Sequence, residues 1–242
     1  MVFEHDHDPE SIRLRIAAKP TALYLRDWVY GGIDGAVTTF AVVAGVAGAD
    51  LAVSIILILG VANLVADGFS MAAGNYSGTK AERDDAERVL AMERRHIREL
   101  PEGEREEVRQ IFAAKGFEGT ELESAVAVIT ANEERWARTM LVEEHGLAPV
   151  ERSPWIAAAA TFSAFLICGV VPLLPYFFGG GLVLSTVMTG TVFFAIGSAK
   201  SRWLLAPWWR SGTETLAIGL VAAGLAYGIG WALKLVVGEI AI

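Results

Sequence analysis

Cysteine is almost absent from this chain, because Cys168 is the single one among 242 residues. A lone thiol excludes an intrachain disulfide and any zinc site built from cysteines. Cys168 lies in a long apolar segment, where a small packing residue is the expected role. Positive charge is also scarce: 20 Lys and Arg stand against 28 Asp and Glu, and the net charge is −8. This balance excludes the basic surface that nucleic-acid binding requires.

Long apolar runs are what the chain has in quantity, with 53% hydrophobic residues and a mean hydropathy of +0.43. About 20 apolar residues span a bilayer as a helix, and five segments reach this length: 27–48, 51–76, 154–178, 182–200 and 212–237. The first segment is long enough to remain as an anchor, so no cleavable signal peptide is expected. The sequence predicts an all-α membrane protein with five transmembrane helices. Pro172 and Pro175 should kink the third.

A charge-rich insert separates the second and third apolar segments. Residues 80–152 contain 18 acidic and 12 basic residues. Strong helix formers continue from the second span to Glu99, so a single helix is expected from about Leu51 to Glu99. Further helices are expected over 103–115 and 119–145, bounded by glycine and proline. The insert should therefore be a three-helix domain carried on an extended second helix.

The distribution of Lys and Arg predicts the topology, since these residues mark the cytoplasmic side. They precede the first span, fill the insert and follow the fourth span, whereas the turns around Asp50 and 177–181 have none. We therefore expect a cytoplasmic N-terminus and insert, with the C-terminus outside. The predicted divisions are a tail over 1–25, transmembrane helices over 26–79, a cytoplasmic metal-binding domain over 80–152 and transmembrane helices over 153–242.

Two polar stripes run through the first two spans. Asp34 and Thr38 share one face of the first, and a carboxylate at that depth costs several kcal/mol or more unless it meets a cavity, a partner or an ion. The second carries polar or sulfur-containing residues at a spacing of four, which places them on one face: Asn63, Asp67, Met71 and Asn75. The stripes either line a cation path or hydrogen-bond the helices together.

Met71 bears on which ion such a path would take. A carboxylate with a thioether favours Fe²⁺ or Co²⁺ over Mg²⁺, although methionine in a membrane helix usually serves as packing. Glycine patterns at Gly31–Gly35 and Gly224–Gly228 allow close helix contact. Because five helices rarely enclose a path alone, we expect a homodimer through the first transmembrane helices.

The insert and the N-terminal tail carry further candidate ligands. Glu93 with His96, Glu104 with Glu107, and Met140 with Glu144 can each present two ligand groups on one helix face. An exposed, charged helix produces the same pattern without a metal. The tract from Glu4 to Asp8 either collects metal or forms a disordered tail.

These motifs resemble those of the vacuolar iron transporter family. The resemblance rests on Asp34-Gly-Ala-Val-Thr-Thr-Phe-Ala-Val-Val-Ala-Gly45, on the stretch from Asn63 to Tyr76, on Pro172-Leu-Leu-Pro-Tyr176 and on the Gly-rich last span. It implies a dimer of five-helix protomers that exports Fe²⁺, and often Mn²⁺, from the cytoplasm in exchange for protons. No permanently bound cofactor is implied, and Co²⁺ and Zn²⁺ are further candidate cargoes.

The resemblance also implies the metal ligands. Asp34 and Met71 match the family's ligands in the membrane, and those of the insert match Glu93, His96, Glu104, Glu107, Met140 and Glu144. The family more often has glutamate where His96 stands. Imidazole is a competent ligand for Fe²⁺ or Zn²⁺, so His96 replaces the glutamate or Glu99 serves instead.

Other functions fit parts of the pattern. Glu93-x-x-His96 is an element of di-iron sites in four-helix bundles, so a membrane-anchored di-iron oxidase or an iron-buffering protein is one alternative. A passive divalent-cation channel is another. A secondary transporter remains the leading hypothesis, in the inner membrane of a bacterium or the vacuolar membrane of a eukaryote.

Overall fold

The computed structural model describes residues 6–17, 24–149, 152–203 and 205–240. Within these ranges all regular structure is helical. Five helical segments are long and apolar enough to cross a membrane: Leu25–Gly48, Val53–Glu99, Pro154–Phe177, Leu182–Lys200 and Trp208–Val236. These are α2, α3, α7 with α8, α9 and α10, and α10 itself extends to Ile240. The prediction of an all-α chain with five such spans is confirmed.

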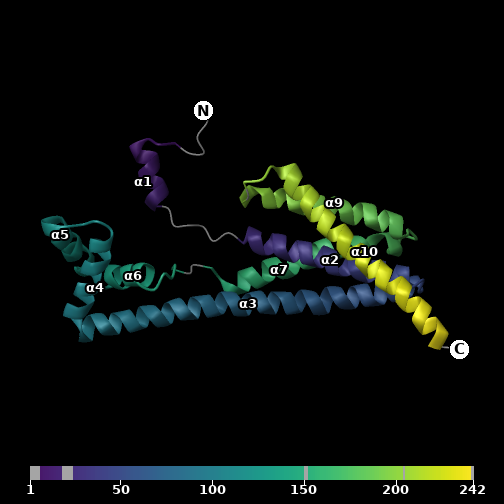
Figure 1. Ribbon diagram of the computed structural model, residues 1–242, viewed down its shortest axis with the longest axis horizontal. Coiled ribbons are helices and arrows are strands. Elements are labelled where there is room, and N and C mark those ends of the chain that lie inside the picture. The colour runs from purple at the N-terminus through teal and green to yellow at the C-terminus, as the bar shows by residue number, and fades with distance from the viewer. Residues whose placement is uncertain (1–5, 18–23, 150–151, 204, 241–242) are drawn as a thin grey trace.

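Helix α3 (Val53–Glu99) is a single rod of 47 residues that serves both parts of the molecule. Its first half packs beside the other long helices, and its second half projects beyond them to the insert (Figure 1). No glycine or proline occurs between Gly78 and Glu99, so nothing in this stretch interrupts the helical hydrogen bonds. The expected single helix ending at Glu99 is confirmed.

The third span is broken where the prolines predict a kink. Helix α7 (Pro154–Gly169) ends before a 3₁₀ turn, η1 (Val171–Leu173), and a short helix, α8 (Leu174–Phe177), follows. Pro172 and Pro175 lack the N–H groups that a continuous helix would use. The hydroxyl of Ser185 on α9 (Leu182–Lys200) donates to the carbonyl of Pro172 at 2.7 Å, so the break also anchors the next span.

Helix α2 (Leu25–Gly48) is the centre of the bundle and contacts α3, α7, α9 and α10 (Trp208–Ile240). A Cβ atom on Gly31 or Gly35 would lie 2.4 Å from the carbonyl oxygen of Thr161 or Phe165, respectively, both on α7. The close contact predicted for this glycine pair therefore occurs with α7 of the same chain. Around Gly224 and Gly228, the other pair, the described residues leave open space.

The insert folds between α3 and α7, and its last predicted helix is two helices. Helices α4 (Pro101–Ala114) and α6 (Glu133–Glu143) pack on α3, and α5 (Gly119–Thr130) packs on α4 and α6. The expected helix over 119–145 was wrong, because the Asn132 side chain accepts a hydrogen bond from the backbone N–H of Arg135 and starts a new helix. The insert core includes Ile97, Val108, Val126, Trp136, Ala137 and Met140.

Directly after the tract from Glu4 to Asp8, the described part of the N-terminal tail forms a helix, α1 (Pro9–Ala17). The Asp8 side chain accepts hydrogen bonds from the backbone N–H groups of Glu10 and Ser11. Pro9 at the first helical position needs no such partner, so the two residues together start the helix. Glu4 and His5, which belong to the predicted metal tract, lie outside the described residues.

Candidate metal centre

Acidic and imidazole side chains from three elements meet on the insert. Glu93 and His96 are one turn apart on α3, and Glu104 and Glu107 are one turn apart on α4. Glu144 and His145 directly follow α6. The fold brings these three pairs together because α4 and α6 both pack on the last turns of α3. Four carboxyl groups and two imidazoles therefore share one region.

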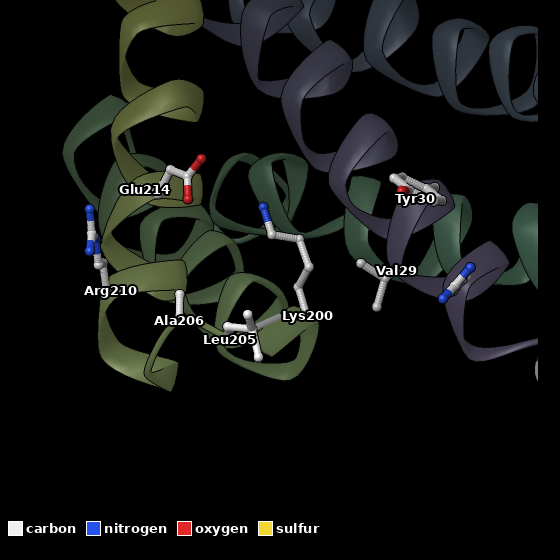
Figure 2. Close-up of a pocket in the computed structure, with 8 residues that line it drawn as sticks. Val29, Tyr30, Lys200, Leu205, Ala206, Arg210 and Glu214 are labelled. Carbon is white, nitrogen blue, oxygen red and sulfur yellow. The ribbon is translucent and has the colours of Figure 1, made fainter. Parts of the chain in front are cut away.

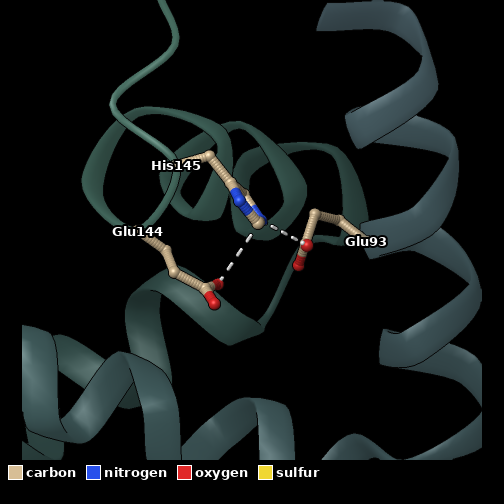
Figure 3. A group of neighbouring side chains, drawn as sticks. All are labelled: Glu93, Glu144 and His145. Atoms are coloured by element: carbon tan, nitrogen blue, oxygen red, sulfur yellow. Dashed lines mark hydrogen bonds and ion pairs between the residues drawn. The ribbon is translucent and has the colours of Figure 1, made fainter. Parts of the chain in front are cut away.

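His145 is the closest partner of Glu93. Its Nε2 atom lies 2.9 Å from Oε1 of Glu93 and 3.6 Å from Oε2 of Glu144. Figure 3 shows the imidazole between the two carboxylates, one from α3 and one from the end of α6. Ligand atoms of these three residues lie within 4.8 Å of one another, a spacing that one metal ion can bridge.

His96 contributes on the other side of the cluster. Its Nδ1 atom lies 3.4 Å from Oε1 of Glu104, and its side chain is 37% exposed. Glu99, the alternative at this position, is exposed at the end of α3. The geometry therefore places His96, and not Glu99, beside the other candidate ligands.

Burial makes this cluster more than a charged surface. Glu93 and Glu104 are 2% and 5% exposed. Oε2 of Glu93 and Oε2 of Glu104 are both buried, and neither receives a hydrogen bond from a donor among the described residues. A buried carboxylate oxygen without a donor is costly, so it calls for a proton or a cation. The site is therefore suited to hold positive charge.

Burial also raises the pKa values of the two candidate ligands on α4. Desolvation, together with the charges of Glu107 and Glu93, raises the pKa of Glu104 to about 8. The pKa of Glu107 is also raised, by desolvation and by the charges of Glu144 and Glu93. At neutral pH Glu104 therefore holds a proton that an arriving divalent cation can displace.

Met140 lies on α6, one turn before Glu144. It is fully buried and packs with Ile97, Val108 and Trp136 in the core of the insert. Borderline transition metals such as Fe²⁺ are suited by these ligand types, which are carboxylate oxygen, imidazole nitrogen and a nearby thioether. His145 was not predicted from the sequence. Its position directly after Glu144 at the end of a helix was the available signal.

A second group of polar residues lies inside the helix bundle. Asp34 on α2 and Asp67 on α3 are half-buried and close enough for their charges to interact. Beside them the Nδ2 of Asn63 donates to the hydroxyl of Thr38 at 3.3 Å, and that hydroxyl donates to the backbone carbonyl of Asp34 at 2.9 Å. The polar stripes predicted on the first two spans therefore face each other here.

The rest of the predicted stripe lies toward the insert and has different partners. Met71 is half-buried and packs against the apolar core of the bundle. The Nδ2 of Asn75 lies 3.0 Å from Oδ1 of Asp27 and 2.7 Å from the hydroxyl of Thr161. Arg152 donates to Asp27 at 2.5 Å, so Asn75 belongs to a bonded network at the insert end of the bundle.

Comparison with known proteins agrees with these features. A family model described as the VIT family matches residues 25–231. The chain is 33% identical over 229 residues to the vacuolar iron transporter of Toxoplasma gondii, covering 89% of this chain and 76% of the relative. It is 33% identical over 208 residues to vacuolar iron transporter 1 of Arabidopsis thaliana, covering 84% and 83% of the two chains. For vacuolar iron transporter 2 of Oryza sativa subsp. japonica the identity is 30% over 244 residues, covering 97% and 99%. The predicted resemblance is confirmed, and this chain belongs to the VIT family.

Proposed function

We propose that this protein is a secondary transporter that moves Fe²⁺, and also Mn²⁺, out of the cytoplasm in exchange for protons. Co²⁺ and Zn²⁺ are further candidate cargoes. Relatives named vacuolar iron transporters support iron as the principal substrate. The membership of the chain in a family of such relatives argues against an enzyme.

The observation that carries the proposal is the pair of carboxylates inside the bundle. Asp34 and Asp67 come from different helices, are both half-buried and lie close enough for their charges to interact. Two like charges in such a place repel, and the repulsion is relieved by a proton or by a divalent cation. Met71, one turn beyond Asp67 on α3, is the proposed thioether ligand next to them.

Exchange follows when protons and metal compete for the same oxygens. Metal that arrives from the cytoplasm displaces protons from the carboxylates, and protons that arrive from the far side release the metal. Thr38, Asn63 and Asn75 are the proposed polar lining of this route. The insert cluster collects the ion first, with Met140 as its thioether and His145 as an added ligand. The other proposed ligands of this cluster are Glu93, His96, Glu104, Glu107 and Glu144.

The proposed orientation has the N-terminus and the insert in the cytoplasm and the C-terminus outside. The abundance of Lys and Arg in the insert supports it. In a bacterium the protein would lie in the inner membrane, and in a eukaryote it would lie in the vacuolar membrane. We also propose a homodimer through α2. Gly31 and Gly35 already contact α7 of the same chain. Asp34 and Thr38, however, are only half-buried within one chain, so this part of α2 has surface left for a partner.

The test is metal flux in liposomes with the full-length protein. An Fe²⁺ gradient should drive uptake together with a pH change on the opposite side, and Asp34→Ala should abolish both. The matched control is Asp50→Ala, because the Asp50 side chain is 81% exposed in the turn between α2 and α3. Unchanged flux in Asp34→Ala would overturn the proposal.

The competing functions give different results in the same assay. Fe²⁺ flux without any proton flux would identify a passive channel. O₂-dependent oxidation of Fe²⁺ by the protein, with no flux, would identify a di-iron oxidase. Saturable metal binding with neither flux nor oxidation would identify a buffering protein.

A further inference from the structure

A basic cavity of about 720 Å³ opens at the end of the bundle that faces the insert. It lies between the first turns of α2, the end of α9 and the first turns of α10. Figure 2 shows Lys200 in the middle, with Arg210 and Glu214 of α10 on one side and Tyr30 of α2 on the other. Arg26 completes the basic lining. None of the candidate metal ligands lines this cavity.

The basic side chains of the cavity are not engaged by other parts of the chain that the structure describes. The side chains of Arg26, Lys200 and Arg210 form no ion pair or hydrogen bond with any described residue. Glu214 is the one acidic residue of the lining, so three positive charges face a single negative charge. Most basic side chains of the insert, by contrast, are paired with neighbouring carboxylates, as Arg109 is with Glu123. The excess positive charge here is available to an anion from outside the chain.

The surroundings of the cavity match the boundary between lipid and water. Trp208 and Trp209 at the start of α10 are 59% and 55% exposed, and Trp is typical of the membrane interface. Leu205 lines the cavity and is fully exposed. Cationic groups and exposed apolar side chains therefore lie together at the same end of the bundle.

We propose that this cavity binds the headgroup of an anionic phospholipid. The guanidinium groups and the ammonium group would donate to the phosphate oxygens, which are strong acceptors, while the acyl chains would lie over Leu205 and the exposed tryptophans. Basic pockets between transmembrane helices bind anionic headgroups for this reason. A membrane lipid fits better than a free phosphate because the rim of the cavity is apolar. The proposal does not depend on transport, since binding occurs without metal.

The test is native mass spectrometry of the full-length protein in detergent, titrated with phosphatidylglycerol or with phosphatidylcholine. We expect phosphatidylglycerol to bind preferentially. Lys200→Gln and Arg210→Gln should each weaken the first binding event by roughly fivefold, the contribution of one basic residue near a membrane. Glu214→Gln should tighten it, because it removes the opposing charge. A gain of affinity cannot result from misfolding, so this variant keeps the test informative.

Arg202→Gln is the matched control, because Arg202 is exposed in the connection between α9 and α10 but does not line the cavity. It removes the same charge from the same end of the bundle and should leave binding unchanged. Equal binding of the two lipids, or an equal loss in Arg202→Gln and Lys200→Gln, would overturn the proposal. Full competition by millimolar inorganic phosphate would also overturn it, because the ligand would then be a free anion.

Discussion

The Nη2 atom of Arg152 lies 2.5 Å from Oδ2 of Asp27, which joins the connection after the insert to the first turn of α2. Asp27 is 8% exposed, and Asn75 of α3 donates to its other oxygen. The guanidinium also lies 5.8 Å from the ring centre of Tyr24. Insert, α2 and α3 are therefore held together by one charged contact.

We expect Asp27→Asn to lower the melting temperature, since it weakens charge-assisted hydrogen bonds worth about 2 kcal/mol. Arg152→Gln should do the same. The double variant should cost no more than either single one, because the two residues act as a pair. Tryptophan fluorescence melting in detergent measures this. Lys234→Gln, which breaks an exposed pair with Asp50, is the control and should change the melting temperature little. Additive losses would contradict the pairing.

Stability of the metal-free protein should depend on Glu104 between pH 5 and 8. The pKa of Glu104 is about 8 in the folded state, against an ordinary value of 4.5. In this range the folded state holds a proton that the unfolded state has lost, so stability falls as pH rises and the contribution is gone above the folded-state pKa. Melting in the presence of a chelator should therefore be less pH-dependent in Glu104→Gln.

The control for this experiment is Glu106→Gln on the same helix. Hydrogen bonds from Gln110 and Arg109 lower the pKa of Glu106, so Glu106 is ionised in both states throughout the range. Its substitution should leave the pH slope as in the wild type. If Glu104→Gln and Glu106→Gln had the same slope, the assignment of the raised pKa would be wrong.

His145→Ala should weaken metal binding to the insert by about tenfold, the lower range for groups that tune a metal site. The reason is the imidazole lying between Glu93 and Glu144. Cobalt(II) is a suitable probe, since loss of a nitrogen ligand alters its visible spectrum as well as its affinity. An unchanged spectrum in His145→Ala would mean that His145 does not bind the ion.

His96 and Glu99 should behave differently in the same titration. His96 approaches Glu104, whereas Glu99 is exposed at the end of α3. We expect His96→Ala to reduce cobalt affinity and Glu99→Ala to leave it near the wild-type value. The reverse order would show that the register of the family motif is shifted by three residues here.

Gly35→Ala should destabilise the bundle by about 2 kcal/mol, the typical cost of overpacking. The added methyl group would lie 2.4 Å from the carbonyl oxygen of Phe165, so α2 and α7 must separate. Gly224→Ala is the matched control, because its added methyl group meets open space on α10. Equal melting temperatures for the two variants would contradict the close contact of α2 with α7.

The five spans and the long second helix could be predicted because they depend on local properties. Apolar length marks the spans, and the absence of helix breakers after Gly78 marks α3. The division at Asn132 was missed because asparagine is tolerated inside a helix, and only its bond to Arg135 shows that it caps one. The use of Gly31 and Gly35 could not be predicted, because a glycine pattern does not say which helix it approaches.

In the candidate site, too, some features follow from local sequence and others only from tertiary packing. Pairs one turn apart, such as Glu93 with His96, follow from helical geometry. The meeting of Glu93 with His145 depends on how α6 returns to α3, which no local pattern contains. Asn75 illustrates the converse, since its place in the polar stripe is local but its bonds to Asp27 and Thr161 come from tertiary packing.

Continuity of α3 gives the protein a mechanical property as well as a shape. At 1.5 Å per residue, Asp67 and Glu93 are roughly 40 Å apart along one unbroken axis of about 70 Å. A tilt of about 5° of such a rod moves one end by roughly 6 Å relative to the other. The helix contains no proline, and its stretch from Thr79 to Glu99 contains no glycine, so the half of α3 that carries the insert resists bending and can act as a lever. Closure of the insert around an ion would then apply torque directly to the helix that carries Asn63 and Asp67.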